Sequence, residues 1–232
     1  MRLTLVCALV LGLLAPVAAP AQECSWQAGW VKAENAKAGN KNWDSDVVMR
    51  FSADFSRRKE AKRVEGYFDQ ASIGCGQSAI LKIVGAKSAD VSLYRIGYYK
   101  GAGARLIQTI KSAKKITAMQ STPPGQYLVK LKSPGYRSTF VPLVITGQVP
   151  SNVTFVSSVL TWQAYNQWGG ESLYKGADGQ RETRAISVSL DRPYDGDGSG
   201  QFRYMEQPLV QLMEQLNLDI NYLTDINLDT AP

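Results

Sequence analysis

Short runs of alternating apolar and polar residues, separated by turn-forming residues, dominate residues 64–149. The runs are SAILKIVG, DVSLYRIGYY, ARLIQTI, GQYLVKLKS and STFVPLVITG. Successive side chains of a strand point to opposite faces, so a period of two predicts strands that turn one face toward a core. Because Gly, Pro, Ser and Asp punctuate these runs at short intervals, the pattern predicts an antiparallel β-sandwich over residues 64–149.

Residues 150–232 have a different pattern, in which predicted strands alternate with a predicted helix. The strands are NVTFVSSVL (152–160), TRAISVSL (183–190) and LDINYL (218–223). The helix is EQPLVQLMEQLNL (206–218), whose apolar residues recur every three or four positions and whose Pro208 falls in the first turn, where a missing N–H costs nothing. This order predicts the front part of an α/β domain, which we expect to be incomplete because few residues follow the last strand.

The N-terminus has the pattern of an export signal. Arg2 precedes an apolar run over 3–17, and Ala19-Pro20-Ala21 is a small-x-small cleavage site, so we predict a signal peptide over 1–21 and a secreted or periplasmic protein. No later segment is apolar enough to span a membrane. Residues 22–63 are interpreted as an N-terminal extension, with a strand over 47–55.

Cleavage of the signal peptide would leave two cysteines, Cys24 and Cys75. In an oxidising compartment they are candidates for one disulfide that ties the N-terminal extension to the sandwich, and two free thiols are the alternative. The basic runs over 57–63 and 111–115 contain no interleaved aromatic residues, so we predict solvated surfaces there and no nucleic-acid partner.

The chain of 232 residues contains no histidine. This absence excludes Ser-His-Asp and Cys-His catalytic arrangements, histidine-ligated zinc and histidine general bases. Any chemistry of this chain must therefore use carboxylates, tyrosines, lysines or a metal ion held by oxygen ligands.

The stretch TWQAYNQWGG (161–170) concentrates indole, phenol and amide groups directly after an apolar strand. Ligands of open α/β sheets bind beyond the carboxyl ends of strands, so these side chains are candidates for a pocket wall. The candidate pocket residues are Trp162, Gln163, Asn166 and Trp168. The alternative is polar packing at a domain interface, in which each amide and indole has a hydrogen-bond partner.

The stretch DGDGSGQFRYME (195–206) has the spacing of a calcium loop. Asp195, Asp197 and Ser199 occupy positions one, three and five, Gly200 occupies the turn position, and Glu206 occupies position twelve. The alternative is a flexible Gly/Asp loop in which Glu206 stabilises the start of the following helix through the helix dipole.

Several motifs occur here in the order found in one known family. They are VEGYFDQASIGCGQS, RIGYYKGAGARL, PPGQYLVKL, TWQAYNQWGGESLY, SLDRPY and NYLTDINL. Over residues 64–232 the chain resembles the C-terminal region of the large subunit of bacterial N,N-dimethylformamidases. The resemblance implies an Ig-like β-sandwich followed by a domain similar to class I glutamine amidotransferases.

The same resemblance implies hydrolysis of a small amide at a mononuclear ferric iron held by two tyrosinates and one glutamate. Carried over by position, Tyr127 and Tyr165 correspond to the tyrosine ligands. The glutamate of the family belongs to a GHDEYW-type segment that this sequence does not contain, so an iron site here would lack its carboxylate.

Two functions follow as hypotheses. The first is an exported, iron-dependent amidohydrolase of the dimethylformamidase type, acting on a small amide and compatible with a homo-oligomer. The second is a non-catalytic secreted binding module whose aromatic cluster holds a glycan or polymer. A calcium-binding structural role for residues 195–206 is a third interpretation.

Overall fold

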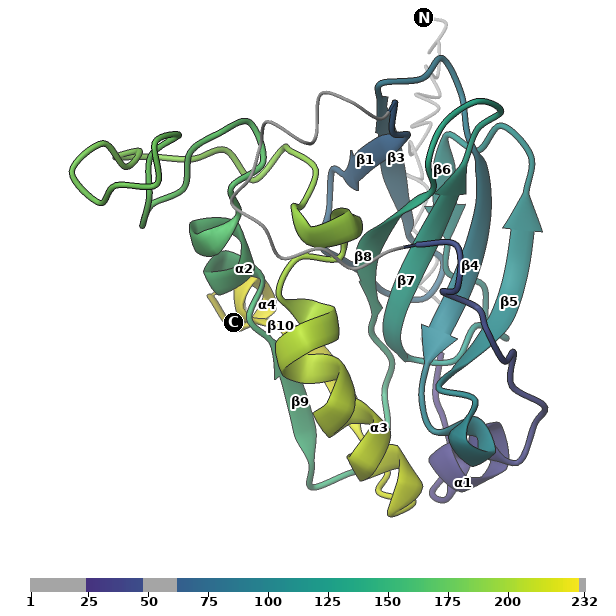
Figure 1. Ribbon diagram of the computed structural model, residues 1–232. Helices are drawn as coiled ribbons and strands as arrows, with labels where there is room; N and C mark the ends of the chain where they lie inside the picture. Colours follow the sequence, from purple (N-terminus) through teal and green to yellow (C-terminus); the bar gives the residue numbers. More distant parts are fainter. Residues whose placement is uncertain (1–23, 48–61, 230–232) are drawn as a thin grey trace, which may run out of the picture.

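The computed structural model describes residues 24–47 and 62–229 (Figure 1). The predicted signal peptide and all but the first residue of the predicted strand over 47–55 lie outside the described residues and stay predictions. Within the described part of the chain, each helix is too short or too polar to cross a lipid bilayer.

A five-stranded sheet forms the centre of the molecule. Its strand order is β2 (Ser72–Ile73), β8 (Thr139–Ile145), β7 (Gly125–Lys132), β4 (Asp90–Ile96) and β5 (Ala104–Ile110). Neighbouring strands are antiparallel apart from β2, which runs parallel to β8. A 3₁₀ turn over Tyr99–Gly101 (η2) connects β4 to β5.

A three-stranded antiparallel sheet packs on one face of the central sheet (Figure 1). It consists of β1 (Glu65–Phe68), β3 (Ser78–Val84) and β6 (Lys115–Thr117). The core between the two sheets contains Phe68 and Leu81 on one side and Val129 and Leu143 on the other. The five alternating runs of the sequence are therefore confirmed as strands, and the chain is β-rich with several sheets.

The other face of the central sheet is covered by the N-terminal extension and by residues after 150. These elements are α1 (Trp30–Asn35), β9 (Thr154–Ser157), α2 (Val159–Tyr165), α3 (Gln207–Gln215), β10 (Asn221–Thr224) and α4 (Asp225–Asp229). Leu128 and Phe140 of the central sheet join a second core with Val210 and Tyr222. Because both faces of β7 and β8 are covered, almost every residue of these two strands is buried.

The region after residue 150 differs from its sequence prediction at two places. The run over 152–160 is a strand only to Ser157, and a helix, α2, then contains Trp162. The predicted strand over 183–190 is wrong, because residues 166–195 contain no strand or helix and extend away from the sheets as the green loops of Figure 1. A strand needs a hydrogen-bonded neighbour, and Ile186 in this run is fully exposed without one.

The other elements after residue 150 agree with the sequence patterns. The helix predicted over 206–218 corresponds to α3, and its Pro208 lies in the first turn. The run over 218–223 corresponds to β10, which pairs in parallel with β9. Residues 202–206 form a π-helical turn (η4) directly before α3, and residues 196–198 form a 3₁₀ turn (η3).

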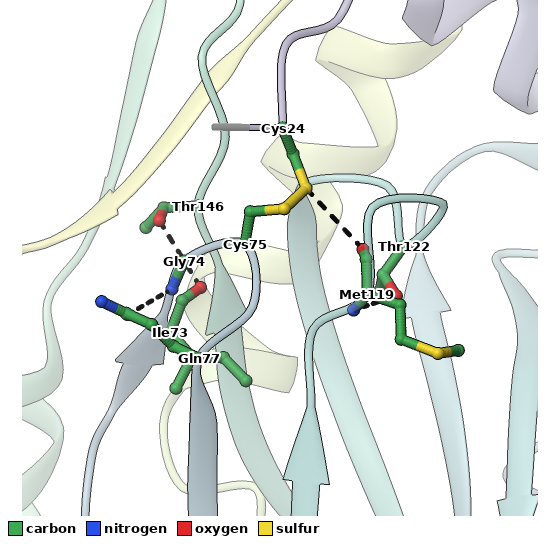
Figure 2. Close-up of a disulfide and its surroundings, with 8 residues drawn as sticks. All are labelled: Cys24, Ile73, Gly74, Cys75, Gln77, Met119, Thr122 and Thr146. Carbon is green, nitrogen blue, oxygen red and sulfur yellow. Dashed lines mark hydrogen bonds between the residues drawn. A yellow bond between two sulfur atoms is a disulfide. The ribbon is translucent and has the colours of Figure 1, made fainter. Parts of the chain in front are cut away.

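Cys24 and Cys75 form a disulfide, with their Cα atoms 5.4 Å apart (Figure 2). Cys75 lies in the turn after β2, where the backbone N–H of Gly74 donates a hydrogen bond of 2.7 Å to Oε1 of Gln77. On the other side, Cys24 Sγ lies 3.8 Å from the carbonyl oxygen of Met119. The disulfide therefore fastens the start of the N-terminal extension to the loops at one end of the two sheets.

Candidate functional site

A cavity of about 80 Å³ lies where the two sheets meet the region after residue 150. Its walls come from residues 67–71 after β1, residues 141–144 of β8, Val159, Trp162 and Gln163 of α2, Leu190, Asp191 and Tyr194 of the irregular segment, and Ile226 of α4. The cavity thus joins segments from most of the length of the described chain. Of the four predicted pocket residues, Trp162 and Gln163 line it.

Trp162 forms the aromatic part of this cavity wall. It is buried, packs edge-on against Tyr194 with ring centroids 6.1 Å apart, and contacts Phe202 with centroids 5.8 Å apart. Its indole N–H donates a hydrogen bond of 2.8 Å to Oε1 of Glu206. The indole is therefore fixed on both its apolar and its polar side.

Gln163 supplies the amide group of the cavity. Its Nε2 donates to the carbonyl oxygen of Leu190 at 3.3 Å, and its Oε1 accepts from Nδ2 of Asn166 at 2.9 Å and from Nε of Arg192 at 3.2 Å. Burial raises the pKa of Tyr194, although a hydrogen bond with Gln163 acts in the opposite direction. The hydroxyl of Tyr194 is therefore protonated at neutral pH and lies beside the Gln163 amide.

Asn166 and Trp168 have structural contacts instead of positions in the cavity wall. The Asn166 side chain donates to the carbonyl oxygen of Pro193 at 2.8 Å and accepts from the backbone N–H groups of Trp168 and Asp195. The Trp168 indole N–H donates to Oε2 of Glu65 at 3.1 Å. Asn166 thus joins the two ends of the irregular segment, and for these two residues the packing interpretation describes the contacts.

Arg192 fixes the same two ends. Its guanidinium donates to the carbonyl oxygens of Gln163, Asn166, Trp168 and Glu171 at 2.8–3.3 Å. Burial is the largest influence on this side chain and lowers its pKa. These bonds hold Leu190, Asp191 and Tyr194 against α2, so the base of the irregular segment is part of the cavity.

Glu206 lies behind Trp162, at the end of the π-helical turn. Its Oε1 also accepts from the backbone N–H of Ser158 at 3.2 Å, whereas its Oε2 is buried and has no hydrogen-bond partner in the described part of the chain. Burial raises the pKa of Glu206, the nearby Asp225 adds to this, and the bonds from Trp162 and Ser158 oppose it. Glu206 orients the Trp162 indole without a cation to balance its charge.

The two residues that correspond to the iron ligands of the resembled family do not form a site together. Tyr127 is fully buried between the sheets, its hydroxyl donates to the carbonyl oxygen of Pro123 at 2.5 Å, and burial raises its pKa well above the ordinary value. Tyr165, at the end of α2, is 44% exposed and stacks on Tyr174 with ring centroids 4.1 Å apart. This arrangement does not fit an iron ion bound by Tyr127 and Tyr165.

The residues with calcium-loop spacing also face different partners. Asp197 forms an ion pair of 2.6 Å with Arg203 and accepts a hydrogen bond from the Ser199 hydroxyl. Oδ2 of Asp195 accepts from the backbone N–H of Gln167 at 3.0 Å, and Glu206 faces Trp162. Over residues 24–47 and 62–229, no three His, Cys, Asp or Glu side chains are grouped as metal ligands.

Sequence reasoning missed several residues of the cavity, above all Tyr194 and Asp191. Both belong to SLDRPY, one of the motifs on which the family resemblance depends, so the motif was noted but not interpreted as part of a site. Residues 67–71 and Ile226 carry no chemical pattern of their own. Only the fold brings them to the cavity.

The comparison with protein families identifies the chain. The family described as N,N-dimethylformamidase beta subunit-like, C-terminal, matches residues 112–232, and the chain belongs to it. Among curated proteins, none matches the chain. A solved structure of a chimeric titin Z1Z2-Z1Z2 tandem, functionalised with a GRGDS peptide from fibronectin, is 16% identical over 39% of this chain, with a TM-score of 0.24. This chain spans 52% of that tandem, and a likeness at this level carries no argument.

The family assignment gives the cavity its context. Trp162, Gln163, Asp191 and Tyr194 all lie within the matched residues, as does Glu206. The match indicates a function related to that of dimethylformamidases and supports a hydrolase of this type.

Proposed function

We propose that this chain hydrolyses the C–N bond of a small amide and that the cavity at Trp162, Gln163 and Tyr194 is its substrate site. The observation that carries the proposal is that TWQAYNQWGG and SLDRPY, two separate motifs of the family resemblance, supply adjoining walls of one cavity. At 80 Å³ the cavity has room for roughly five to eight water-sized positions. That size suits an amide with a short acyl group and small N-substituents.

The chemistry of the walls suits such a substrate. The Gln163 amide and the Tyr194 hydroxyl are neutral groups that can hydrogen-bond an amide carbonyl or N–H. Trp162 and Leu190 supply apolar surface for N-alkyl groups. In the overall reaction, water adds to the carbonyl carbon, the C–N bond breaks, and the amine departs with a proton from water, leaving a carboxylate and a protonated amine near neutral pH.

We assign no step to iron, because Tyr127 and Tyr165 do not fit a common iron site. Elemental analysis of the purified chain tests the cofactor hypothesis separately from the cavity. Iron near one atom per chain that is lost in Tyr165→Phe would restore Tyr165 as a ligand. Calcium without iron would direct attention to residues 195–206.

We propose the finer fold and the cellular location on the same basis. Two sheets packed face to face support an Ig-like sandwich over 64–149, and the parallel pair β9–β10 with its helices supports an amidotransferase-like domain over 150–232. The Cys24–Cys75 disulfide supports export, since such bonds persist in oxidising compartments. Cleavage after Ala21, detected by mass spectrometry of protein expressed with its native N-terminus, tests the export signal.

The hydrolysis itself is tested by incubating the purified chain with N,N-dimethylformamide and measuring release of dimethylamine and formate. We expect Gln163→Ala to lower kcat/KM at least about tenfold, since it removes a polar wall group that contacts the substrate. Gln167→Ala is the matched control, because Gln167 lies in the same motif and does not line the cavity. Absence of hydrolysis by the wild-type chain with any short N-substituted amide, or an unchanged kcat/KM in Gln163→Ala, would contradict the proposal.

A further inference from the structure

The outer side of α3 carries a row of exposed leucines. Leu209, Leu212 and Leu216 are 49%, 51% and 61% exposed, whereas Val210 and Glu214 of the same helix are buried. In Figure 1, α3 lies at the front of the molecule with no other element drawn in front of it. The helix therefore has two apolar sides, and the described residues bury only one of them.

The spacing of this row is that of a helix–helix seam. Leu209, Leu212 and Leu216 follow one another at intervals of three and then four residues, which are the intervals of the apolar positions in a coiled-coil heptad. Residues at these intervals form a straight stripe along one side of a helix. Such a stripe packs best against another helix that carries the same spacing.

The surface around the leucine row carries no charge. Besides the leucines, the outward-facing residues of α3 are Gln207, Pro208, Gln211 and Gln215. The single charged side chain of α3, Glu214, is buried against Arg95. A solvent-facing helix normally carries charged side chains, and their depletion is a property of the centres of protein–protein interfaces.

A hollow of about 270 Å³ adjoins the row, between α3 and the turn η2. Leu212 and Pro208 form one wall, and Tyr98 and Gly103 form the opposite wall. A side chain from a second molecule could enter this hollow beside Leu212. The surface is therefore not a flat patch but a ridge with a neighbouring groove.

We propose that α3 is a homodimer interface in which the leucine row of one copy packs against the leucine row of a second copy across a two-fold axis. Two identical copies satisfy the requirements of the surface, because each supplies a helix of matching spacing and neither brings a charge that would repel the other. In a two-fold interface, the same patch must be complementary to itself. An uncharged ridge beside an uncharged groove meets that condition.

The proposal is tested on the full signal-free chain by sedimentation velocity over a range of concentrations. We expect the wild-type chain to dimerise and Leu212→Glu to raise the dimer dissociation constant at least about 100-fold, because it places a charge at the centre of both copies of the seam. Far-UV circular dichroism of the variant checks that the fold is retained. In addition, Leu212→Cys is expected to form an intermolecular disulfide on mild oxidation.

Leu160→Glu and Leu160→Cys on α2 are the matched controls, since Leu160 is also a helical leucine and is 47% exposed. They should dimerise as the wild-type chain does, and Leu160→Cys should not crosslink. A wild-type chain that remains monomeric at about 100 µM, a concentration above most specific dimer dissociation constants, would overturn the proposal. A dimer equally resistant to Leu212→Glu and Leu160→Glu would overturn it as well, because the interface would then lie elsewhere.

Discussion

Two glutamates on the same helical stretch, Glu214 in α3 and Glu206 just before it, have opposite surroundings. Both carboxyl groups of Glu214 bind Arg95, at 2.5 and 3.1 Å, and the pair is fully buried. Glu214 also accepts hydrogen bonds from Asn35 and Tyr222. Glu206 has bonds to Trp162 and Ser158 on one oxygen, no partner on the other among the described residues, and no cation.

This difference separates a structural carboxylate from a candidate site carboxylate. Burial alone would lower the pKa of Arg95, yet Glu214 raises it well above the ordinary value, so the two side chains stabilise each other's charged forms. The cluster also includes Glu34 and Tyr99 and thus joins the N-terminal extension, the central sheet and α3. Glu206 contributes no such link, and its incomplete contacts are typical of groups near functional sites.

The same substitution at both positions is expected to break this comparison most strongly. Glu214→Gln leaves Arg95 buried without a counter-charge and should lower the free energy of unfolding by about 3–5 kcal/mol. Glu206→Gln keeps an oxygen that can accept from Trp162 and should change it by less than about 1 kcal/mol, the net size of one hydrogen bond. Urea unfolding of both variants at neutral pH provides the measurement. Equal losses would show that the two carboxyl groups have the same role.

Loss of the disulfide tests how firmly the N-terminal part of the Glu214 cluster is held. Cys24 and Cys75 are 51 residues apart in sequence, and closing a loop of that size restricts the unfolded chain. The double variant Cys24→Ser, Cys75→Ser should therefore lower the free energy of unfolding by about 2–4 kcal/mol. Thermal unfolding with and without reductant supplies the control, because the double variant should not respond to reductant. An equally stable double variant would argue against this role.

A smaller loss is expected at Gly97, which leaves room for the Arg95–Glu214 pair. A Cβ atom at this position would overlap Oε2 of Glu214 and lie 2.9 Å from Nη1 of Arg95. Gly97→Ala should therefore lower the free energy of unfolding by about 1–3 kcal/mol through overpacking. Gly101→Ala is a control for the space alone, since nothing lies within 4 Å of its Cβ position, although its φ of 86° adds backbone strain. A Gly97→Ala variant as stable as the wild type would indicate a looser cluster.

The smallest effect concerns the pH dependence of stability. The pKa of Glu206 is raised from its ordinary value of 4.5, so the folded chain holds this proton more tightly than the unfolded chain does. Its contribution is fully present below the unfolded pKa and is lost as the pH rises through the folded value. The wild type should therefore lose stability relative to Glu206→Gln between pH 4 and neutral pH. Parallel pH profiles, or a difference that changes in the opposite direction, would contradict the assigned surroundings.

The sequence predicted the sheets well because strand patterning is local. Alternation over runs such as 125–133 and 138–147 records a side-chain period that the backbone imposes wherever a strand forms. The same reasoning failed at 183–190, where the alternation is present but no neighbouring strand pairs with it. Whether a strand forms depends on a partner, which a single run of sequence does not reveal.

The candidate site was predicted in part for a similar reason. Trp162 and Gln163 were identified because an unusual local composition marked them. The contact between Glu206 and Trp162 and the position of Tyr194 depend on how α2, the π-helical turn and the irregular segment pack together. Contacts between residues so distant in sequence follow from the tertiary structure and left no local pattern.

The central claim is that the cavity beside Trp162 binds a small amide, and indole N–H resonances report on it directly. In the chain labelled with ¹⁵N-tryptophan, titration with N,N-dimethylformamide should shift the Trp162 signal, assigned from Trp162→Phe, in a saturable manner. Trp168, whose indole N–H is bound to Glu65 away from the cavity wall, should shift less. A Trp162 signal that does not move, or that moves in step with all other tryptophans, would contradict the account.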